Sequence, residues 1–487
     1  MNRLSSSAVL FFSLISYRFQ HAAATFKYFA GYEPQTNVTT PALIDLDVED
    51  IVSGLGGTCG ASCLLNDCSV DTVAASGNGC NYDGPTVPWP YEPGDHGAFD
   101  VWTNGKNSLK SNNVMLTIRG FVSEAKTKAS GNSPSTQDVD YTDNKFIAIM
   151  NKYWKSKNLD EHTWGEDMIL AAFEGTKVGS NTHLDFSTVG RDFRKEAIQK
   201  GIVYTNIFPY VIWEMQDAVN DCNAEKYIDA VHSWDTAVAL YAVSKTRGKG
   251  YGIHGPDGGN LQYRLADKRC INFKTCADGF AGTAQVNQDI FALFNLGKEI
   301  AESDCAALNS LAEKIGTLAL IPFLQGTLRY LWSTKIGQTA KDAGELWAFA
   351  TTILPFVAEA DANIAEMLYR RAWQLDFTSN SYEEIKSALE ATYPKLGAGA
   401  GFGLVTCEAV GDLYNGPSDA QRISTRACSS TSRPEASIDL RLVGGLTFLA
   451  FALTALSAYT CFLKRRAEKK YNTAVFQGMW NGTGPRA

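Results

Sequence analysis

The sequence is poor in histidine and lacks the short motifs that mark common hydrolase and nucleotide-binding sites. It has six histidines in 487 residues, and one of them lies within the first 24 residues. No HExxH, GxSxG or P-loop pattern occurs, so no motif supports a zinc peptidase, a serine hydrolase or a nucleotide-binding loop. These absences favour a binding protein over an enzyme.

The sequence also has no excess of positive charge. It contains 44 Lys and Arg against 52 Asp and Glu, which gives a formal net charge of −8. Nucleic-acid binding depends on basic side chains that neutralise phosphates. We therefore expect no nucleic-acid partner, and the acidity mildly favours cations.

Each end of the chain carries a hydrophobic run with a topological meaning. Residues 1–24 have a basic start, an apolar core and an Ala-rich end, which is typical of a secretory signal. Residues 442–463 form an uncharged run that would span roughly 33 Å as a helix. The basic residues that follow place the tail, 464–487, in the cytosol. These features predict a single-pass type I protein of the plasma membrane with an extracellular domain.

The cysteine count fits an oxidising compartment. Eleven cysteines are present, and only Cys461 lies in the predicted span. The remaining ten predict five disulfides, although their pairing cannot be read from spacing. Four of them cluster in a Gly- and Cys-rich N-terminal region, 25–110, where disulfides are favoured over a zinc site. In the same region Asn37 begins an Asn-Val-Thr glycosylation sequon.

Helical periodicity dominates the rest of the outer part. We assign residues 111–428 to one domain, with a single predicted strand at 113–119, and residues 429–441 to a stalk before the membrane. The fold class is therefore mainly α, a helical-bundle ectodomain with a disulfide-rich N-terminal region and one C-terminal transmembrane helix. Helices are expected at 144–153, 191–200, 207–220, 227–243, 286–301, 305–330, 340–358 and 360–373.

Three carboxylates interrupt the apolar stripes of these predicted helices. They are Glu214, Asp235 and Glu345. A buried charge is costly unless it is paired or bound to a metal, and inward carboxylates from several helices are a common way to build a metal site. Separate salt bridges are the alternative for each of them.

Two side chains near Asp235 extend this candidate metal site. His232 lies three residues before Asp235, and Tyr241 continues the same helix. Carboxylate and tyrosinate oxygens are hard donors that suit ferric iron. A solvated histidine and a tyrosine used only in core packing are the alternatives.

A basic pair, Lys268 and Arg269, follows a glycine-rich turn after this helix. Arginine can hold an oxyanion through two parallel hydrogen bonds. The pair therefore predicts an anion site, and the alternative is a solvated surface pair.

Several blocks of the sequence resemble the algal iron-assimilation proteins, the phytotransferrin or low-iron-inducible periplasmic family. Together they cover roughly residues 140 to 430, and the type I topology is similar to that of the membrane-anchored members. The blocks are Val189–Asn206, Trp234–Tyr241, Leu265–Cys270 with Asn272, Phe273 and Cys276, Val286–Gly297, and Gly344–Pro355.

The resemblance implies a non-enzymatic, cell-surface protein that captures Fe(3+) with carbonate as a synergistic anion. It further implies delivery by endocytosis through endosomes, with endocytic or reductase partners. On this view residues 111–428 form the iron-binding domain. The resemblance carries over Asp235, Tyr241 and Glu345 as metal residues, with Lys268 and Arg269 on the anion side, and the helical pattern adds Glu214 and His232 to the expected metal residues. The alternatives are an adhesion or signalling ectodomain without metal and, less favoured, a helical metallohydrolase.

Overall fold

The computed structural model describes residues 31–38, Asp45, Val48, 108–111, 114–117 and most of 144–428. Within the last range it leaves out 161–163, 180–183, 243, 246–250, 253–258, 338, 379–380, 416–420 and 425. The predicted signal, stalk, membrane span and tail, and the Cys59–Cys80 cluster, lie outside the described residues. The contacts divide the chain into two compact units, Met1–Ser429 and Ser430–Ala487, and every described residue belongs to the first.

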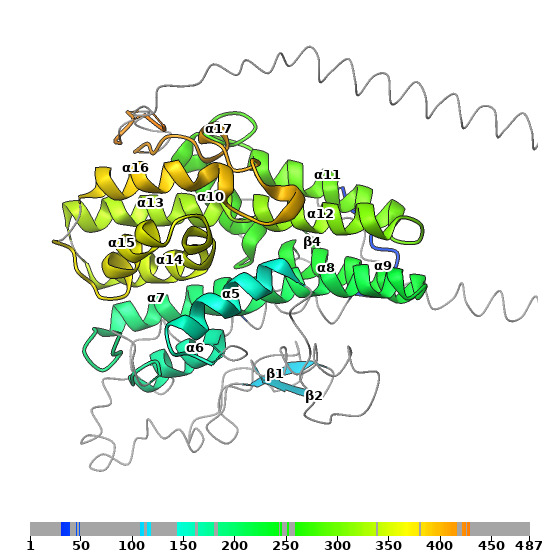
Figure 1. Cartoon of the computed structure of the whole chain (residues 1–487), viewed down its shortest axis with the longest axis horizontal. Coiled ribbons are helices and arrows are strands. Elements are labelled where there is room, and N and C mark those ends of the chain that lie inside the picture. The colour runs from blue at the N-terminus through cyan, green and yellow to red at the C-terminus, as the bar shows by residue number, and fades with distance from the viewer. Residues whose placement is uncertain are drawn as a thin grey trace, which may run out of the picture. The chain divides into compact units, whose positions relative to one another are not determined.

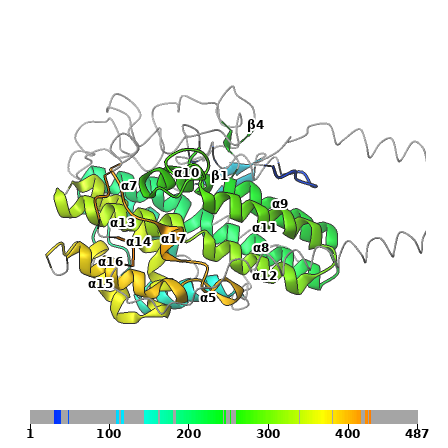
Figure 2. The same cartoon turned by 90° about the horizontal axis from the view of Figure 1, so that it is seen from above.

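The described part of the chain is mainly α-helical, which confirms the predicted class. In both Figure 1 and Figure 2, four long helices run together toward one end of the molecule: α8 (Phe208–Asn223), α9 (Tyr227–Ala242), α11 (Gln285–Ile300) and α12 (Cys305–Leu318). Another four gather at the opposite end: α7 (Arg191–Gly201), α10 (Gln262–Phe273), α13 (Ile321–Ile336) and α14 (Ala340–Ala360).

Shorter elements complete the described fold. They are the helices α5 (Lys145–Ser156), α6 (Trp164–Glu174), α15 (Ala362–Ala372), α16 (Tyr382–Thr392), α17 (Cys407–Val410), η3 (Ile202–Ile207), η4 (Tyr393–Lys395) and η5 (Gly399–Gly401). The predicted strand is confirmed as β2 (Val114–Thr117), which pairs antiparallel with β1 (Ser108–Ser111). A second short antiparallel pair joins β3 (Ser244–Lys245) and β4 (Tyr251–Gly252).

One expected helix was wrong in its extent. The run expected as a single helix, 305–330, is two helices, α12 and α13, which break at Ala319 and Leu320. Pro322 stands at the start of α13 and has no N–H to donate to the carbonyl of Leu318 four residues earlier. The helices α6, α10 and α16 were not predicted at all.

The core runs through α13 and α14, whose side chains are buried nearly all round. In the part of the chain that the structure describes, one helical stretch, Cys305–Ile336, passes the length and hydropathy test for a membrane span. Two-thirds of its most apolar window, 67 %, is buried inside the protein, as in an ordinary core helix.

Three disulfides link described residues. Cys222–Cys305 joins the end of α8 to the start of α12, and Cys270–Cys276 closes a short loop after α10. Cys407–Cys428 ties α17 to the last described residues. All six of these cysteines belong to the ten that the sequence predicts to be disulfide-bonded.

Candidate functional site

Charged and phenolic side chains from five elements, α7, η3, α10, α13 and α14, lie close enough to interact electrostatically. We call them the Glu345 cluster. Its members are Glu196 and Lys200 of α7, Tyr204 of η3, Lys268 and Arg269 of α10, Arg329 and Tyr330 of α13, and Glu345 of α14. The cluster thus unites Glu345 with Lys268 and Arg269, three of the residues that the sequence singled out.

Two glycines allow α14 to pack closely enough to bring these groups together. A Cβ at Gly344 would lie 2.5 Å from the carbonyl oxygen of Phe193, so the backbones of α14 and α7 approach closely beside Glu345. A Cβ at Gly326 would lie 2.2 Å from the ring of Phe349. Larger side chains at these two positions would push α7 or α13 away from α14.

Tyr204 enters the cluster from a π-helix. The six residues of η3 join α7 directly to α8, and the N–H of Phe208 bonds to the carbonyl of Val203, five residues back. Pro209 follows and cannot donate to the carbonyl of Thr205, which favours this wider turn. Single π-turns inside α-helices occur frequently at functional sites.

Glu196 and Glu345 form a buried carboxyl pair. Each is 6 % exposed. Burial first, and then the charge of Glu345, raises the pKa of Glu196 to about 7, while Lys200 and Lys341 act against this rise. The Nζ atom of Lys200 lies 4.0 Å from an Oε atom of Glu196. The proximity of the Glu345 carboxyl thus favours the protonated form of Glu196.

Two tyrosines face this carboxyl pair. Burial, followed by the charge of Glu345, raises the pKa of Tyr204 well above its ordinary value. The same two causes and a hydrogen bond to Glu345 raise the pKa of Tyr330 to about 12. Both phenols are therefore neutral at pH 7 and would release a proton on binding a cation.

Arg269 lies above a pair of aromatic rings. Its Cζ atom is 5.8 Å from the ring centroid of Tyr330 and 5.9 Å from that of Phe349, and those two rings stack with their centroids 5.6 Å apart. Cation–π attraction holds the guanidinium in this place. The side chain is 9 % exposed, and its Nε and Nη1 atoms have no hydrogen-bond partner among the described residues.

More positive charge surrounds Arg269. Burial, together with the charges of Lys200, Arg264 and Arg269, lowers the pKa of Lys268 to about 8, although Lys268 lies at the exposed edge of the cluster. Burial and the charge of Arg269 also lower the pKa of Arg329. The cluster therefore holds a basic side and an acidic side in contact.

Asp235 occupies a different environment. One of its carboxylate oxygens accepts from the Tyr32 hydroxyl at 2.6 Å. The other accepts from the backbone N–H groups of Gln35 and Thr36 at 2.8 and 2.7 Å, and from the Thr36 hydroxyl at 2.8 Å. His232 Nδ1 lies 3.1 Å from that hydroxyl. Asp235 thus anchors the segment 31–38 to α9, and burial still raises its pKa.

Tyr241 and Glu214 also lie in the interior. The Tyr241 hydroxyl donates to Asn287 Oδ1 at 2.8 Å, and burial and then the charge of Asp267 raise its pKa. Glu214 is fully buried on α8. Within the described ranges no group of three or more His, Cys, Asp or Glu side chains is arranged to hold a metal ion. Asn37 is exposed, as a glycosylation site requires.

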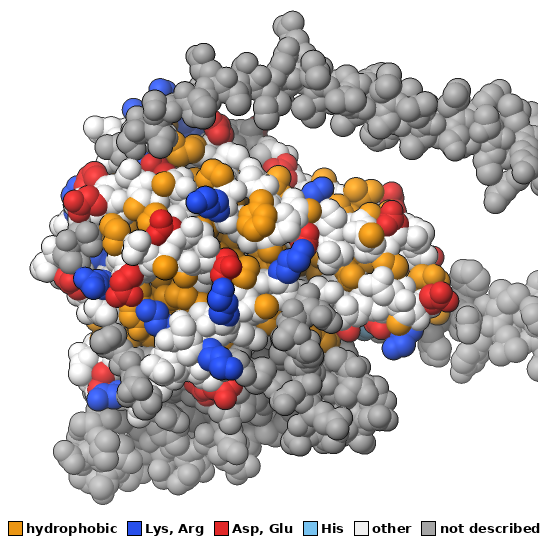
Figure 3. Space-filling view, in the orientation of Figure 1, with side chains coloured by type: hydrophobic (Ala, Val, Ile, Leu, Met, Phe, Trp, Pro, Cys, Tyr) orange, Lys and Arg blue, Asp and Glu red, His pale blue; other side chains and the backbone are white. Residues whose placement is uncertain are grey.

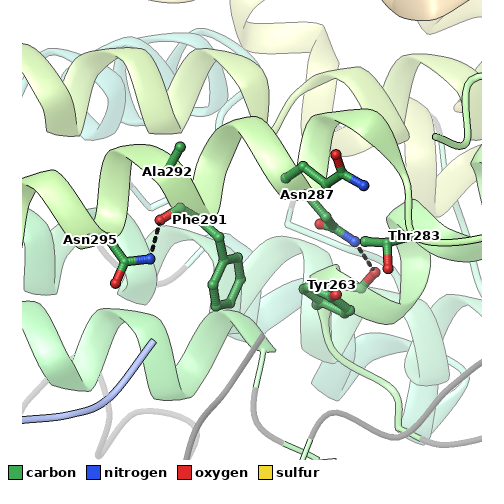
Figure 4. Close-up of a pocket in the computed structure, with 7 residues that line it drawn as sticks. Tyr263, Thr283, Asn287, Phe291, Ala292 and Asn295 are labelled. Atoms are coloured by element: carbon green, nitrogen blue, oxygen red, sulfur yellow. Dashed lines mark hydrogen bonds between the residues drawn. The ribbon is translucent and has the colours of Figure 1, made fainter. Parts of the chain in front are cut away.

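A pocket of about 370 Å³ opens between Tyr263 and α11 (Figure 4). Its polar groups already bond within the protein. The Asn287 amide donates to Tyr263 O at 2.8 Å and to Asp267 at 2.9 Å, and the Asn295 amide donates to Phe291 O at 2.9 Å. The pocket is therefore a weaker candidate for a functional site than the Glu345 cluster.

The sequence alone did not single out Glu196, Arg329 or Tyr330. Glu196 stands in the polar run Arg-Asp-Phe-Arg-Lys-Glu, which is typical of a solvated helix, and Tyr330 stands in an apolar run that is typical of a core helix. Tyr204 is one of several tyrosines in or beside the predicted helices, and its spacing does not separate it from the others. The π-turn enforced at Pro209 is the one local signal that marks its position.

These observations define a helical, disulfide-linked domain with a buried cluster of hard oxygen donors and basic groups. Residues 94–252 match the family model described as low iron-inducible periplasmic protein, which confirms the resemblance over that region. The match includes Glu196, Lys200 and Tyr204, whereas Lys268, Arg269 and Glu345 lie beyond it. The family's description links the region to the response to low iron and names no enzymatic activity. No curated protein and no solved structure matches the chain.

Proposed function

We propose that the protein binds ferric iron for uptake and that the Glu345 cluster is the binding site, with carbonate as the partner anion. The observation that carries this proposal is the meeting of two carboxyls and two phenols with an arginine whose buried Nε and Nη1 atoms lack hydrogen-bond partners among the described residues. Iron is the cargo of the protein, not a resident cofactor.

The acidic side of the cluster suits a hard trivalent cation. Carboxylate and phenolate oxygens are the side-chain donors that hard metal ions prefer. We propose Glu196, Glu345, Tyr204 and Tyr330 as the donors. The cation would displace the proton that the raised pKa of Glu196 favours, together with the phenolic protons, so binding is expected to release acid.

The basic side of the cluster suits the anion. Arg269 can donate to an oxygen of a carbonate from its Nε or its Nη1 atom, each of which is buried and unbonded within the described structure. Lys268 stands at the exposed edge of the same group. An anion held here would supply further oxygen donors to the iron and offset its charge.

The remaining predicted metal residues take structural roles in this proposal. Asp235 and His232 hold the N-terminal segment through Thr36, and Tyr241 bonds to Asn287. Glu214 is buried on α8. We therefore propose a ligand set that leaves these four residues out. Attachment to the plasma membrane and delivery by endocytosis stay predictions.

The tyrosines give this proposal a direct spectroscopic test. Phenolate bound to ferric iron absorbs visible light by charge transfer. Adding ferric nitrilotriacetate and bicarbonate to the full-length chain in detergent should produce such a band. Tyr204→Phe and Tyr330→Phe should each weaken or shift it, and the matched control Tyr241→Phe should leave it unchanged. A band that survives the double change Tyr204→Phe/Tyr330→Phe, or no binding at all, would refute the assignment.

A further inference from the structure

The disulfides that link described residues differ in how far solvent reaches them. In Cys407–Cys428 both residues are half-buried. In each of the other two at least one residue is buried, namely Cys222, Cys270 and Cys276. A thiolate must reach a sulfur atom to open a disulfide, so exposed disulfides are the more easily reduced ones. Of these three, Cys407–Cys428 is therefore the most open to reduction.

This disulfide closes a segment that we call the clasp, residues 407–415, 421–424 and 426–428. Its two limbs are joined by the backbone bond from Ile423 N–H to Leu413 O at 3.0 Å and by an ion pair between Arg422 and Asp412 at 3.1 Å. The arginine of that pair is 40 % exposed, and exposed ion pairs add little stability. Cys428 has a φ of 53°, a left-handed conformation that is unfavourable for a residue with a Cβ. The disulfide is thus the strongest link between the two limbs.

The clasp covers the C-terminal end of α10. The N–H of Tyr414 donates to the carbonyl of Asn272 at 2.8 Å. Gly411 lies so close that a Cβ there would be 2.6 Å from the carbonyl oxygen of Phe273. The last four carbonyls of a helix have no partner within it. The clasp therefore satisfies one of these groups in α10 and covers another.

Side chains extend this contact to the loop that follows α10. The rings of Tyr414 and Phe280 meet edge to face with their centroids 5.4 Å apart, and Lys274 Nζ lies 5.5 Å from the Phe280 ring and 5.9 Å from the Tyr414 ring. Gln325 of α13 donates to Val410 O at 2.8 Å. The clasp thus holds this loop against the core.

The clasp also covers a buried ion pair on α16. Lys386 and Glu390 are 3 % and 8 % exposed and pair with each other. Lys386 Nζ also donates to the carbonyl of Arg426, a clasp residue, at 3.3 Å. Two buried charges need all of their hydrogen bonds. Departure of the clasp would remove one of these bonds and admit water to the pair.

We infer that Cys407–Cys428 is a redox switch, in which the oxidised clasp fixes the end of α10 and a small dithiol opens it. One thiolate of the dithiol attacks a sulfur of the pair and forms a mixed disulfide, and the second thiol then displaces that cysteine. The bond between Cys407 and Cys428 breaks, and a disulfide forms within the dithiol. Two electrons and two protons pass to the cysteines, and none passes to a metal.

The consequence for the candidate site follows from distance along one helix. Lys268 and Arg269 lie about one turn before the end of α10 that the clasp caps. Opening the clasp would let this last turn fray and loosen the basic side of the Glu345 cluster. This last step rests on the proposed function, whereas the switch itself does not.

The first test asks which disulfide is reduced first. The full-length, iron-free chain in detergent is treated with increasing dithiothreitol, alkylated with iodoacetamide and mapped by peptide mass spectrometry. Among the three disulfides of the described residues, Cys407–Cys428 should be labelled at the lowest dithiol concentration. Labelling of Cys222–Cys305 or Cys270–Cys276 at the same or a lower concentration would overturn the inference.

The second test measures the effect on α10 without a reductant. In Cys407→Ser/Cys428→Ser, hydrogen exchange of the last turn of α10 and of residues 274–284 should be faster by at least about 10-fold, as expected for local fraying. The control Cys222→Ser/Cys305→Ser removes a disulfide elsewhere and should leave exchange there unchanged. If the first variant does not fold, wild-type protein reduced and alkylated at Cys407 and Cys428 takes its place. Unchanged exchange in the opened protein, or an equal rise in the control, would refute the switch.

A third variant separates the clasp from its disulfide. Tyr414→Ala keeps Cys407–Cys428 but loses the ring contacts with Phe280 and Lys274. It should speed exchange in residues 274–284 by a smaller factor than the opened disulfide does. Exchange as slow as in the wild type would show that the clasp does not hold this loop.

Ferric binding distinguishes failure of the switch from failure of the proposed function. Cys407→Ser/Cys428→Ser should weaken the apparent affinity for ferric nitrilotriacetate by at least about 5-fold, the lower end of coupling between sites. A chain that binds iron equally well with the clasp closed or open would refute the coupling alone. A chain that never binds iron but shows the selective reduction and faster exchange would refute the proposed function and leave the switch standing.

Discussion

Asp235 and Glu345 are both carboxylates buried on helices, yet their surroundings differ in kind. Asp235 receives four hydrogen bonds, all from the segment 31–38, and three of them converge on one oxygen. Glu345 instead meets another carboxyl, two phenols and several basic groups. The four hydrogen bonds make Asp235 a structural anchor for the segment 31–38. The groups around Glu345 leave electric charge in the cluster that is not balanced.

The comparison shows that burial of a carboxylate does not by itself indicate a metal site. Neutral N–H and O–H donors stabilise an ionised carboxylate locally and occupy its lone pairs. A cluster of acids, phenols and bases in contact has exchangeable protons and unbalanced charges instead. Surface charge gives no such contrast, since basic and acidic side chains lie interspersed on the face shown in Figure 3.

The largest expected effect separates the two carboxylates by ferric affinity. Glu345→Gln should weaken ferric binding by more than about 100-fold, since loss of a group that only orients a ligand already costs 10- to 100-fold. Asp235→Asn should change it by less than about 3-fold, because Asp235 lies among the N-terminal contacts. Competition against nitrilotriacetate measures both. Equal losses in the two variants would abolish the distinction.

Substitution of Asp235 should instead lower the stability of the fold. Asp235→Ala leaves the Tyr32 hydroxyl and the Gln35 and Thr36 N–H groups without their acceptor. We expect the free energy of unfolding to fall by about 2 kcal/mol, with faster proteolysis near residues 31–38. Urea unfolding gives the first value and limited digestion the second. Thr36→Ala, which removes one of the four bonds, should cost less, and a larger loss in that variant would argue against the anchor.

The pH dependence of stability should trace to the acid pair of the cluster. The pKa of Glu196 is raised to about 7 in the folded protein, so the folded state binds more protons than the unfolded state between about pH 4.5 and 7. Stability therefore falls as the pH rises through this window, by at most about 1.4 kcal/mol per pH unit. Glu196→Gln should flatten that slope in iron-free protein, as measured by urea unfolding at several pH values. An unchanged slope would contradict the raised pKa of Glu196.

The smallest effect is expected at Asn37, next to the Asp235 anchor. The residue is exposed although its neighbour Val38 is buried, so a glycan can attach without disturbing the contacts of Thr36. Asn37→Gln should remove one glycan, seen as a shift in gel mobility, and change the free energy of unfolding by less than about 0.5 kcal/mol. A loss as large as that of Asp235→Ala would mean that Asn37 belongs to the anchor.

Much of the helical framework could be predicted because it depends on local spacing. The helices at 191–201, 227–242 and 340–360 appear close to their expected limits, since an apolar stripe of period 3.6 is a property of neighbouring residues. The break between α12 and α13 was missed although Pro322 marks it. The apolar residues continue across the break, and the first turn of a helix tolerates proline, so Pro322 did not stand out.

The candidate site, too, could be predicted only where its signal lies within one segment. Glu345, Lys268 and Arg269 stood out because a charge in an apolar stripe and a basic pair are visible in one segment. The partners of Asp235 lie 199 to 203 positions away in the chain. No pattern within one segment can reveal a hydrogen bond formed at that separation. The sequence thus singled out both carboxylates but could not tell the anchor from the cluster.

By itself, then, the sequence determined the mainly α class, most limits of the helices that it predicted and the use of cysteine in disulfides, and it singled out Glu345, Lys268 and Arg269 of the candidate site. Only the tertiary structure decided that Glu196, Tyr204 and Tyr330 join Glu345, through close approach of α14 to α7 at Gly344 and a π-turn before Pro209. The physical reason is that helical periodicity depends on residues close together in the sequence. The groups that surround a buried charge depend instead on how the helices pack.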